Sequence, residues 1–486
     1  MRLTYLAYSF NLVLLIFSVV LLLPIVVALC YHELNAIFPF LIASVTALMS
    51  AITIKSIVKG TSSIKSINDI KKSEGLCVVV FSWILAGIFA SIPFLFFGLS
   101  PLNAFFEATS GITTTGATIF THYNYPHALF FWRSFTQWLG GMGIIVLFIA
   151  ILPQFAVAGR QMFFAEAPGP TEDKFTPRIK NTASALWRIY AGLTVLEFMI
   201  LIFCGMNVFE ALCHSLSSMS GGGFSPNGDS IIGYSYTIIW VIAFFMFFAG
   251  TSFNLQYRTW TKFNPLELFK NEEFRTYFSV VVIVALALSV SLFSNLHYDI
   301  MKSLTNSFFN VISVISSTGF CSDDFASWDY TSKILLFIAF MFGSCASSAG
   351  GGLKIMRWLL VFKTMKYEMI KILHPKAVFN IKIGNYSVPK DVLYQILMFV
   401  LYYFAIIIVS AFIIALMEQN TSLAITTAVS AVGNVGPGFG IAGPLGNFDS
   451  FSDLSKIILI IDMYVGRLEL IPFLVLFQKD LWVFKG

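Results

Sequence analysis

Long runs of apolar residues constrain this chain more than any other feature. A helix that crosses a bilayer needs about 20 mostly apolar residues, and such runs recur along the whole sequence. Of the 486 residues, 57% are hydrophobic and only 11% are charged, whereas soluble domains usually carry about 25% charged residues. The sequence therefore predicts an all-α integral membrane protein and argues against a soluble fold.

About ten of these runs are long enough to be membrane spans. They lie near residues 5–30, 36–58, 76–98, 128–153, 183–206, 235–256, 276–295, 331–362, 391–417 and 454–478. Four shorter apolar segments lie near residues 103–113, 208–219, 304–316 and 422–432. These segments are too short to cross a bilayer and too apolar for ordinary loops, so we expect re-entrant helices.

Basic residues are concentrated in alternate loops, which predicts the orientation of the chain. The pattern fits an even number of spans with both termini in the cytoplasm. On this map the outer side carries acidic residues such as Glu107 and Glu210. One hypothesis is an acidic mouth that concentrates cations before entry; the alternative is that outer loops carry acids without such a role.

A unit of span, short segment, glycine-containing loop and span recurs about every hundred residues. Two N-terminal spans in residues 1–72 precede the four units. The expected units are 73–182, 183–274, 275–390 and 391–486. Since each unit holds two spans, all four share one orientation, and repeats of this kind surround an axis along the membrane normal. We therefore expect four re-entrant loops to meet at a central pore.

Non-helical backbone at membrane depth is tolerated only where protein buries it or water lines it. Rings of backbone carbonyls can replace the hydration shell of a cation, and glycine adopts the required backbone angles at little steric cost. One glycine recurs in each loop, and the aligned loops contain no carboxylate. The predicted filter residues are Thr114, Thr115, Gly116, Ser220, Gly221, Gly222, Ser317, Thr318, Gly319, Asn434, Val435 and Gly436. The run Gly221–Gly223 leaves the second loop ambiguous by one residue.

These loops, and the stretch from Ala165 to Ile179, resemble the Trk/Ktr/HKT superfamily of potassium transport proteins over essentially the whole chain. The two extra N-terminal spans are similar to the TrkH type of membrane subunit. The resemblance implies potassium uptake across the cell inner membrane by a homodimer with one pore per protomer. It also implies a TrkA-type cytoplasmic ring that binds nucleotide and controls gating. In this family a serine in place of the first filter glycine goes with sodium transport, and Gly116 therefore favours potassium.

The run 331–362 is interrupted by small residues from Gly343 to Gly352, which cannot form a comfortable continuous helix. The resemblance implies that this break, with Gly350, Gly351 and Gly352, is an intramembrane gating loop; the alternative is an immobile packing break. Lys354 follows the glycines and either lies in the pore or extends to the inner interface.

Arg467 lies inside the last apolar run, where a charged side chain costs roughly 2.5–3.5 kcal/mol even on lenient scales. The resemblance implies an electrostatic barrier beside the gating loop. The alternative is a salt bridge with Asp462 or Glu469.

Two other functions remain to be weighed. A membrane-embedded enzyme would need a converging acid, base or metal set, and the sequence offers none, so we expect no catalysis, no nucleic-acid partner and no cofactor bound by this chain. Potassium is then a substrate, and membrane lipid surrounds the chain. A sodium-permeable or proton- or sodium-coupled symporter remains an alternative.

Overall fold

The computed structural model describes residues 3–59, 72–143, 179–375, 380–384 and 386–470, together with Phe473 and Leu476. The described part is almost entirely helical, and its one sheet is the two-stranded pair β1 (Lys382–Ile383) and β2 (Tyr386–Ser387). Among the described residues, six helical segments are long and apolar enough to cross a membrane, or seven if one bent pair of helices counts as a single span. These helices make the chain a multi-pass membrane protein, as the apolar runs predict.

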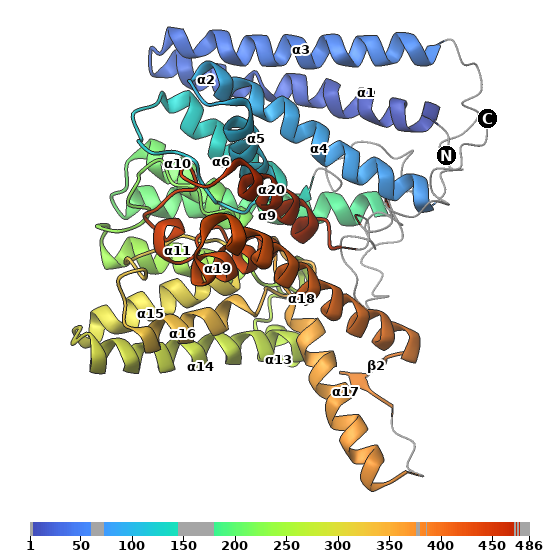
Figure 1. Ribbon diagram of the computed structural model, residues 1–486, viewed down its shortest axis with the longest axis vertical. Helices are drawn as coiled ribbons and strands as arrows, with labels where there is room; N and C mark the ends of the chain where they lie inside the picture. Colours follow the sequence, from blue (N-terminus) through green and yellow to red (C-terminus); the bar gives the residue numbers. More distant parts are fainter. Residues whose placement is uncertain are drawn as a thin grey trace.

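The N-terminal helices form a closely packed group at one side of the molecule (Figure 1). This group consists of α1 (Leu3–Val20), α2 (Leu23–Cys30) and α3 (Leu34–Lys59). Ala36, Ala43 and Ala47 of α3 are fully buried, and the Ser44 hydroxyl donates to the Ser18 carbonyl at 2.7 Å. Small residues allow the close approach of helix backbones that holds helices together in lipid.

After this group, the chain four times forms a long helix, a short helix, an extended segment and a further helix. The first two sets are α4 (Lys72–Phe96), α5 (Pro101–Ile112) and α6 (His127–Gly141), then α9 (Ile179–Phe203), α10 (Val208–Ser220) and α11 (Tyr236–Ala249). The last two are α14 (Glu272–Asn295), α15 (Ile300–Ile315) and α16 (Tyr330–Phe340), then α18 (Lys390–Glu418), α19 (Thr421–Gly433) and α20 (Asp453–Arg467).

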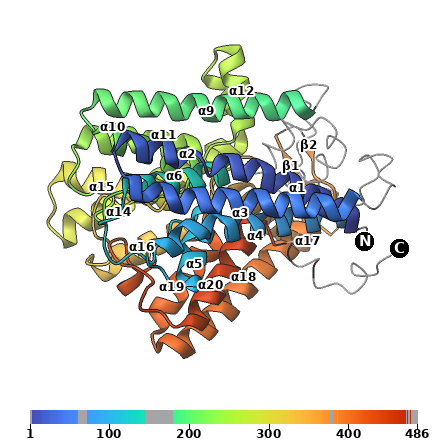
Figure 2. The same cartoon turned by 90° about the horizontal axis from the view of Figure 1, so that it is seen from above.

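The short helices α5, α10, α15 and α19 coincide with the four segments expected from the sequence. Each begins at a residue whose side chain accepts a backbone N–H of the first turn. The capping residues are Ser100, Asn207, Asp299 and Asn420. Such caps satisfy donors that a helix start leaves unpaired, so the local sequence sets where these helices begin. Most residues of all four helices are buried, and Figure 2 shows α5 near the middle of the bundle.

The expected span 235–256 is wrong as one straight helix. It divides into α11 and α12 (Phe253–Lys262), which meet at 101°. Gly250 lies at the bend, where an added Cβ would be 2.5 Å from the Tyr277 hydroxyl. A side chain there would collide with α14, so the backbone turns at a residue that has none.

Three other expected spans are interrupted or end before the expected residue in the described structure. The run 331–362 is interrupted as predicted: α16 ends at Phe340 and α17 (Ile355–Leu373) begins 15 residues later. In the last set, α20 ends at Arg467, whereas a span to residue 478 was expected. In the first set, α6 ends at Gly141, and the stretch Ala165–Ile179 lies almost wholly outside the described residues.

A buried ion pair joins the short helix and the following helix of the first set. The Arg133 Nε lies 2.8 Å from Glu107 Oε1, and their side chains are 2% and 0% exposed. The guanidinium also donates to the Ser225 carbonyl at 3.1 Å and lies over the rings of Phe120 and Phe224. The hypothesis that Glu107 contributes to an acidic mouth is therefore wrong, because Arg133 neutralises it away from solvent.

We expect Glu107→Gln to lower thermal stability sharply, because breaking a buried pair by removing one partner costs about 3–5 kcal/mol. Thermal unfolding of the purified protein in detergent would measure the loss. The matched control is Glu418→Gln, which removes a half-buried carboxylate that caps Ser452. A melting temperature equally lowered by both changes would contradict a special role of the buried pair.

Candidate functional site

Four extended segments follow the four short helices and repeat one hydrogen-bond pattern. The carbonyl of a serine in the last turns of each helix accepts the N–H five residues later, at 2.7–2.9 Å. The serines are Ser110, Ser217, Ser313 and Ser430. In the first three segments the same carbonyl also receives the N–H of the sixth residue at 3.4–3.5 Å. Each segment thus folds back over the end of its own helix.

This pattern settles the alignment of the second segment. The glycine six residues after the serine is Gly116, Gly319 and Gly436 in three segments, and it is Gly223 in the second. These four glycines have φ values of 82°, 83°, 104° and 75°, whereas Gly222 has no positive φ. The predicted set Ser220, Gly221 and Gly222 is therefore displaced by one residue, and the equivalent residues are Gly221, Gly222 and Gly223.

A second left-handed position lies two residues before each of these glycines. It holds Thr114, Gly221, Ser317 and Asn434, with φ between 52° and 67°. Left-handed backbone is costly for residues with a Cβ unless the surroundings enforce it. Three of the four segments keep a polar side chain here, so the tight turn at the end of each short helix is maintained despite that cost.

The four segments contact one another in a closed ring. A Cβ added to Gly116 would lie 2.2 Å from the Gly222 carbonyl oxygen, and one added to Gly223 would lie 1.9 Å from that of Thr318. The ring continues from Gly319 to the Val435 oxygen at 2.0 Å, and from Gly436 to the Thr115 oxygen at 2.5 Å. Each glycine therefore accepts the backbone of the next segment at a distance that no side chain permits.

Residues around the ring support its backbone. Two groups of them, Gln137 and the four serines, were not identified from the sequence. Gln137 of α6 donates to the Gly222 carbonyl at 2.5 Å and accepts the Phe224 N–H at 3.0 Å. The Asn434 amide donates to Thr115 Oγ1 at 3.0 Å. The four serines could have been found by their constant distance of six residues before the glycine, but Gln137 has no such signal.

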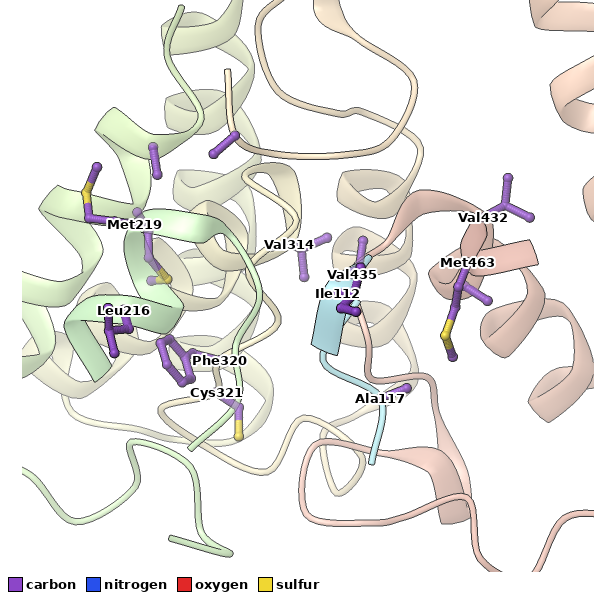
Figure 3. Packing of buried hydrophobic residues seen from close by; sticks show 14 of the residues in the cluster. Ile112, Ala117, Leu216, Met219, Val314, Phe320, Cys321, Val432, Val435 and Met463 are labelled. Atoms are coloured by element: carbon purple, nitrogen blue, oxygen red, sulfur yellow. The ribbon is translucent and has the colours of Figure 1, made fainter. Parts of the chain in front are cut away.

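Buried apolar side chains from all four sets surround these segments (Figure 3). On one side of the ring lies a hollow whose lining includes Gly116, Gly223, Gly319 and Gly436. Among the described residues, no group of three or more His, Cys, Asp or Glu side chains could hold a metal ion. Oxygen atoms for a cation at this site would therefore come from the backbone and hydroxyl groups.

On the other side of the ring lies the interruption between α16 and α17, here called the α16–α17 loop (Met341–Lys354). The Gly351 N–H donates to Ser317 Oγ at 2.5 Å. A Cβ added to Gly350 would lie 2.4 Å from the Ser316 oxygen, and one added to Gly351 would lie 2.7 Å from the Gly433 oxygen. The consecutive glycines thus allow this loop to press directly against the third and fourth segments.

Two basic side chains hold the α16–α17 loop in this place. Lys354 donates to the Gly350 carbonyl and to Ser344 Oγ, so its ammonium lies under the loop. Arg467 donates to the Ala349 carbonyl at 2.8 Å and to the carbonyls of Gly140 and Gly141 at 2.5 and 3.0 Å. Lys354 and Arg467, together with Gly141 and Gly350, line one cavity below the ring.

The two carboxylates considered as salt-bridge partners of Arg467 also have other partners. Glu469 pairs with Arg357, and Asp462 accepts the Ser410 hydroxyl at 2.8 Å. Arg467 joins the loop to the end of α6, so it lies at the place where an electrostatic barrier was expected.

Comparison with known proteins yields consistent matches. The model of the TrkH family, described as cation transport protein, matches residues 42–482. The chain is 39% identical to the Trk system potassium uptake protein TrkH of Salmonella typhimurium, covering 85% of this chain and 87% of that protein. For TrkH of Escherichia coli K12 the identity is also 39%, over 86% and 88%. The crystal structure of the potassium transporter TrkH from Vibrio parahaemolyticus superposes with a TM-score of 0.88 at 30% identity, covering 99% and 100%.

The one-residue displacement in the second segment is testable. We expect Gly223→Ala to destabilise the protein far more than Gly222→Ala. Gly223 has a positive φ, and a Cβ there would meet the backbone of the third segment. A Cβ at Gly222 would meet the side chain of Gln137, which can move. Monodispersity and melting temperature in detergent would report the difference. A larger loss of stability for Gly222→Ala than for Gly223→Ala would indicate that Gly222, and not Gly223, is equivalent to the glycines of the other three segments.

Proposed function

Because this chain belongs to the TrkH family of cation transport proteins, we propose that it is the membrane subunit of a potassium uptake system and conducts potassium through the ring of four segments. The family consists of transporters and not of enzymes. The observation that carries the proposal is the closed contact of four equivalent segments, reached from one side through a hollow and covered on the other by a loop.

In this proposal the four sets are pore-forming repeats, within residues 73–182, 183–274, 275–390 and 391–486, around one conduction axis. The carbonyls of Thr115, Gly222, Thr318 and Val435 occupy the same position in each segment. Carbonyl rings coordinate a dehydrated potassium ion in selective filters. The four short helices end at the ring, and the negative end of a helix dipole favours a cation there.

The filter then comprises Thr114–Gly116, Gly221–Gly223, Ser317–Gly319 and Asn434–Gly436, with Gly223 replacing Ser220 from the sequence alignment. The segments carry no acidic side chain, which supports selection by carbonyl geometry instead of by a ring of carboxylates. The four serines hold the filter backbone. Three of their hydroxyls, those of Ser110, Ser217 and Ser430, are buried without a hydrogen-bond partner among the described residues.

The α16–α17 loop is the gate in this proposal, and Arg467 and Lys354 hold it closed. Their positive charges lie in the cavity that a potassium ion must cross, so they also oppose its passage electrostatically. Opening requires the loop to leave Ser317 and Gly433. A nucleotide-binding TrkA-type ring in the cytoplasm would supply that free energy, acting on a homodimer in the cell inner membrane with cytoplasmic termini.

We expect Gly116→Ser to reduce the preference for potassium over sodium, because its Cβ would displace the Gly222 carbonyl from its place in the ring. Separate potassium and sodium fluxes into liposomes containing the purified protein would measure the ratio. Equal fluxes of both ions through the wild type would refute potassium selectivity, and a coupled symporter would instead show flux that follows an imposed proton or sodium gradient.

We expect Arg467→Ala to raise potassium flux severalfold, since it removes a charge from the cavity and the hydrogen bonds that tie the loop carbonyl of Ala349 to the end of α6. Arg467→Lys keeps the charge but loses the bidentate geometry, so it separates the two effects. Flux unchanged in a correctly folded Arg467→Ala protein would rule out a gating role for this residue.

A further inference from the structure

The bend after α11 sends the chain out of the direction of the membrane spans. α11 and α12 meet at 101°, so a membrane normal along α11 would place α12 close to the membrane plane. α12 and the short α13 (Leu266–Lys270) form a hairpin, here called the α12–α13 hairpin (Phe253–Lys270). Figure 2 shows α12 at the margin of the bundle, beyond α9.

The hairpin has one buried and one exposed apolar side. Leu255 and Leu268 pack with Phe274 in a small core. On the other side four large apolar residues are exposed to 48–91% of their surface. They are Trp260, Phe263, Leu266 and Phe269. Four large exposed apolar residues within ten positions are unusual for a face in contact with water and favour an interaction site.

The exposed side is continuous with the surface that the spans present to lipid. The Phe269 ring lies 5.3 Å from that of Phe274 and 5.8 Å from that of Phe278 on α14. Phe278 is 41% exposed, and Phe244 on α11 is 57% exposed. The same lipid that covers these span residues therefore reaches the hairpin without a break.

Basic residues accompany the apolar ones. Arg258, Lys262 and Lys270 lie within the hairpin, against one acidic residue, Glu267. Helices with aromatic and apolar residues on one side and Lys or Arg on the other lie in the headgroup region of a bilayer and prefer anionic lipid. Tryptophan is enriched at the same level.

We propose that the α12–α13 hairpin is an interfacial anchor, which binds phospholipid of the leaflet at the inner end of α11 and transmits that contact to the α16–α17 loop. The connection is direct. The Ala349 N–H donates to the Ala249 carbonyl at 3.1 Å, the Cys345 N–H to that of Gly250 at 2.9 Å, and the Phe253 N–H to that of Ser347 at 3.0 Å.

These three bonds join the bend to the middle of the α16–α17 loop. A hairpin held at the lipid surface therefore holds the loop in its covering position. The transmitted effect on flux rests on the gating function proposed above, whereas the lipid contact does not.

The lipid contact is tested by fluorescence in liposomes made with brominated phospholipids. The contribution of Trp260 is the difference between the wild type and Trp260→Phe, with Trp240→Phe on the span α11 as the matched control. We expect Trp260 to be quenched most by bromine placed near the headgroups. Quenching by aqueous iodide and not by brominated lipid would overturn the anchor and indicate a soluble partner or bare water at this surface.

The transmission is tested by potassium flux through the variant with Trp260→Ser and Phe263→Ser. We expect flux to rise about threefold or more, and the wild type to pass more potassium in neutral than in anionic liposomes. The matched control is Phe203→Ser, which removes an 87% exposed apolar side chain at the end of α9. Lipid quenching of Trp260 with flux unchanged in the double variant would overturn the transmission. If neither the wild type nor the Arg467→Ala variant passed potassium, the proposed function itself would be refuted.

Discussion

The whole structure depends on one constraint, which is that backbone outside a helix must find hydrogen-bond partners at membrane depth. Four extended segments lie in the interior of this bundle, and each satisfies the constraint in the same two ways. Its first N–H groups return to a serine carbonyl of its own short helix. Its glycine then allows the neighbouring segment to approach within contact distance. A single segment could not do this, so the four are stable only as a ring.

The same constraint explains the α16–α17 loop. Its backbone is also non-helical and also lies inside the bundle, so it must bind what surrounds it. It uses Ser317 on the ring side and the bend after α11 on the other. Two of its carbonyls, those of Ala349 and Gly350, accept hydrogen bonds from Arg467 and Lys354. The two basic side chains are therefore needed to hold the loop in place. The free-energy cost of burying their charges in the membrane is offset by hydrogen bonds to carbonyls that would otherwise lack donors.

The sequence predicted the membrane class, the four short helices and the break after Phe340, because apolar length and small-residue runs act locally. It did not predict the bend at Gly250, since the contact of Gly250 with the Tyr277 hydroxyl of another helix cannot be read from the local sequence. It also misjudged Glu107, whose partner Arg133 lies 26 residues away and is invisible to composition. The second segment was misaligned because three consecutive glycines do not define which of them aligns with the other segments. The distance of six residues from Ser217 to Gly223 does define it.

The repeated backbone does not make the four segments equivalent in function. The left-handed position next to the loop holds a threonine, a glycine, a serine and an asparagine. Of these, Ser317 accepts the N–H of Gly351, while Asn434 lies against the same glycine from the fourth segment. Four identical segments would offer the loop four equivalent binding positions. The divergence of this position places the hydrogen bond to the loop on the third segment, beside Asn434 of the fourth and close to the helix that carries Arg467. One loop can therefore cover a four-part ring, because the ring is symmetric in its backbone and asymmetric in the side chains at its edge.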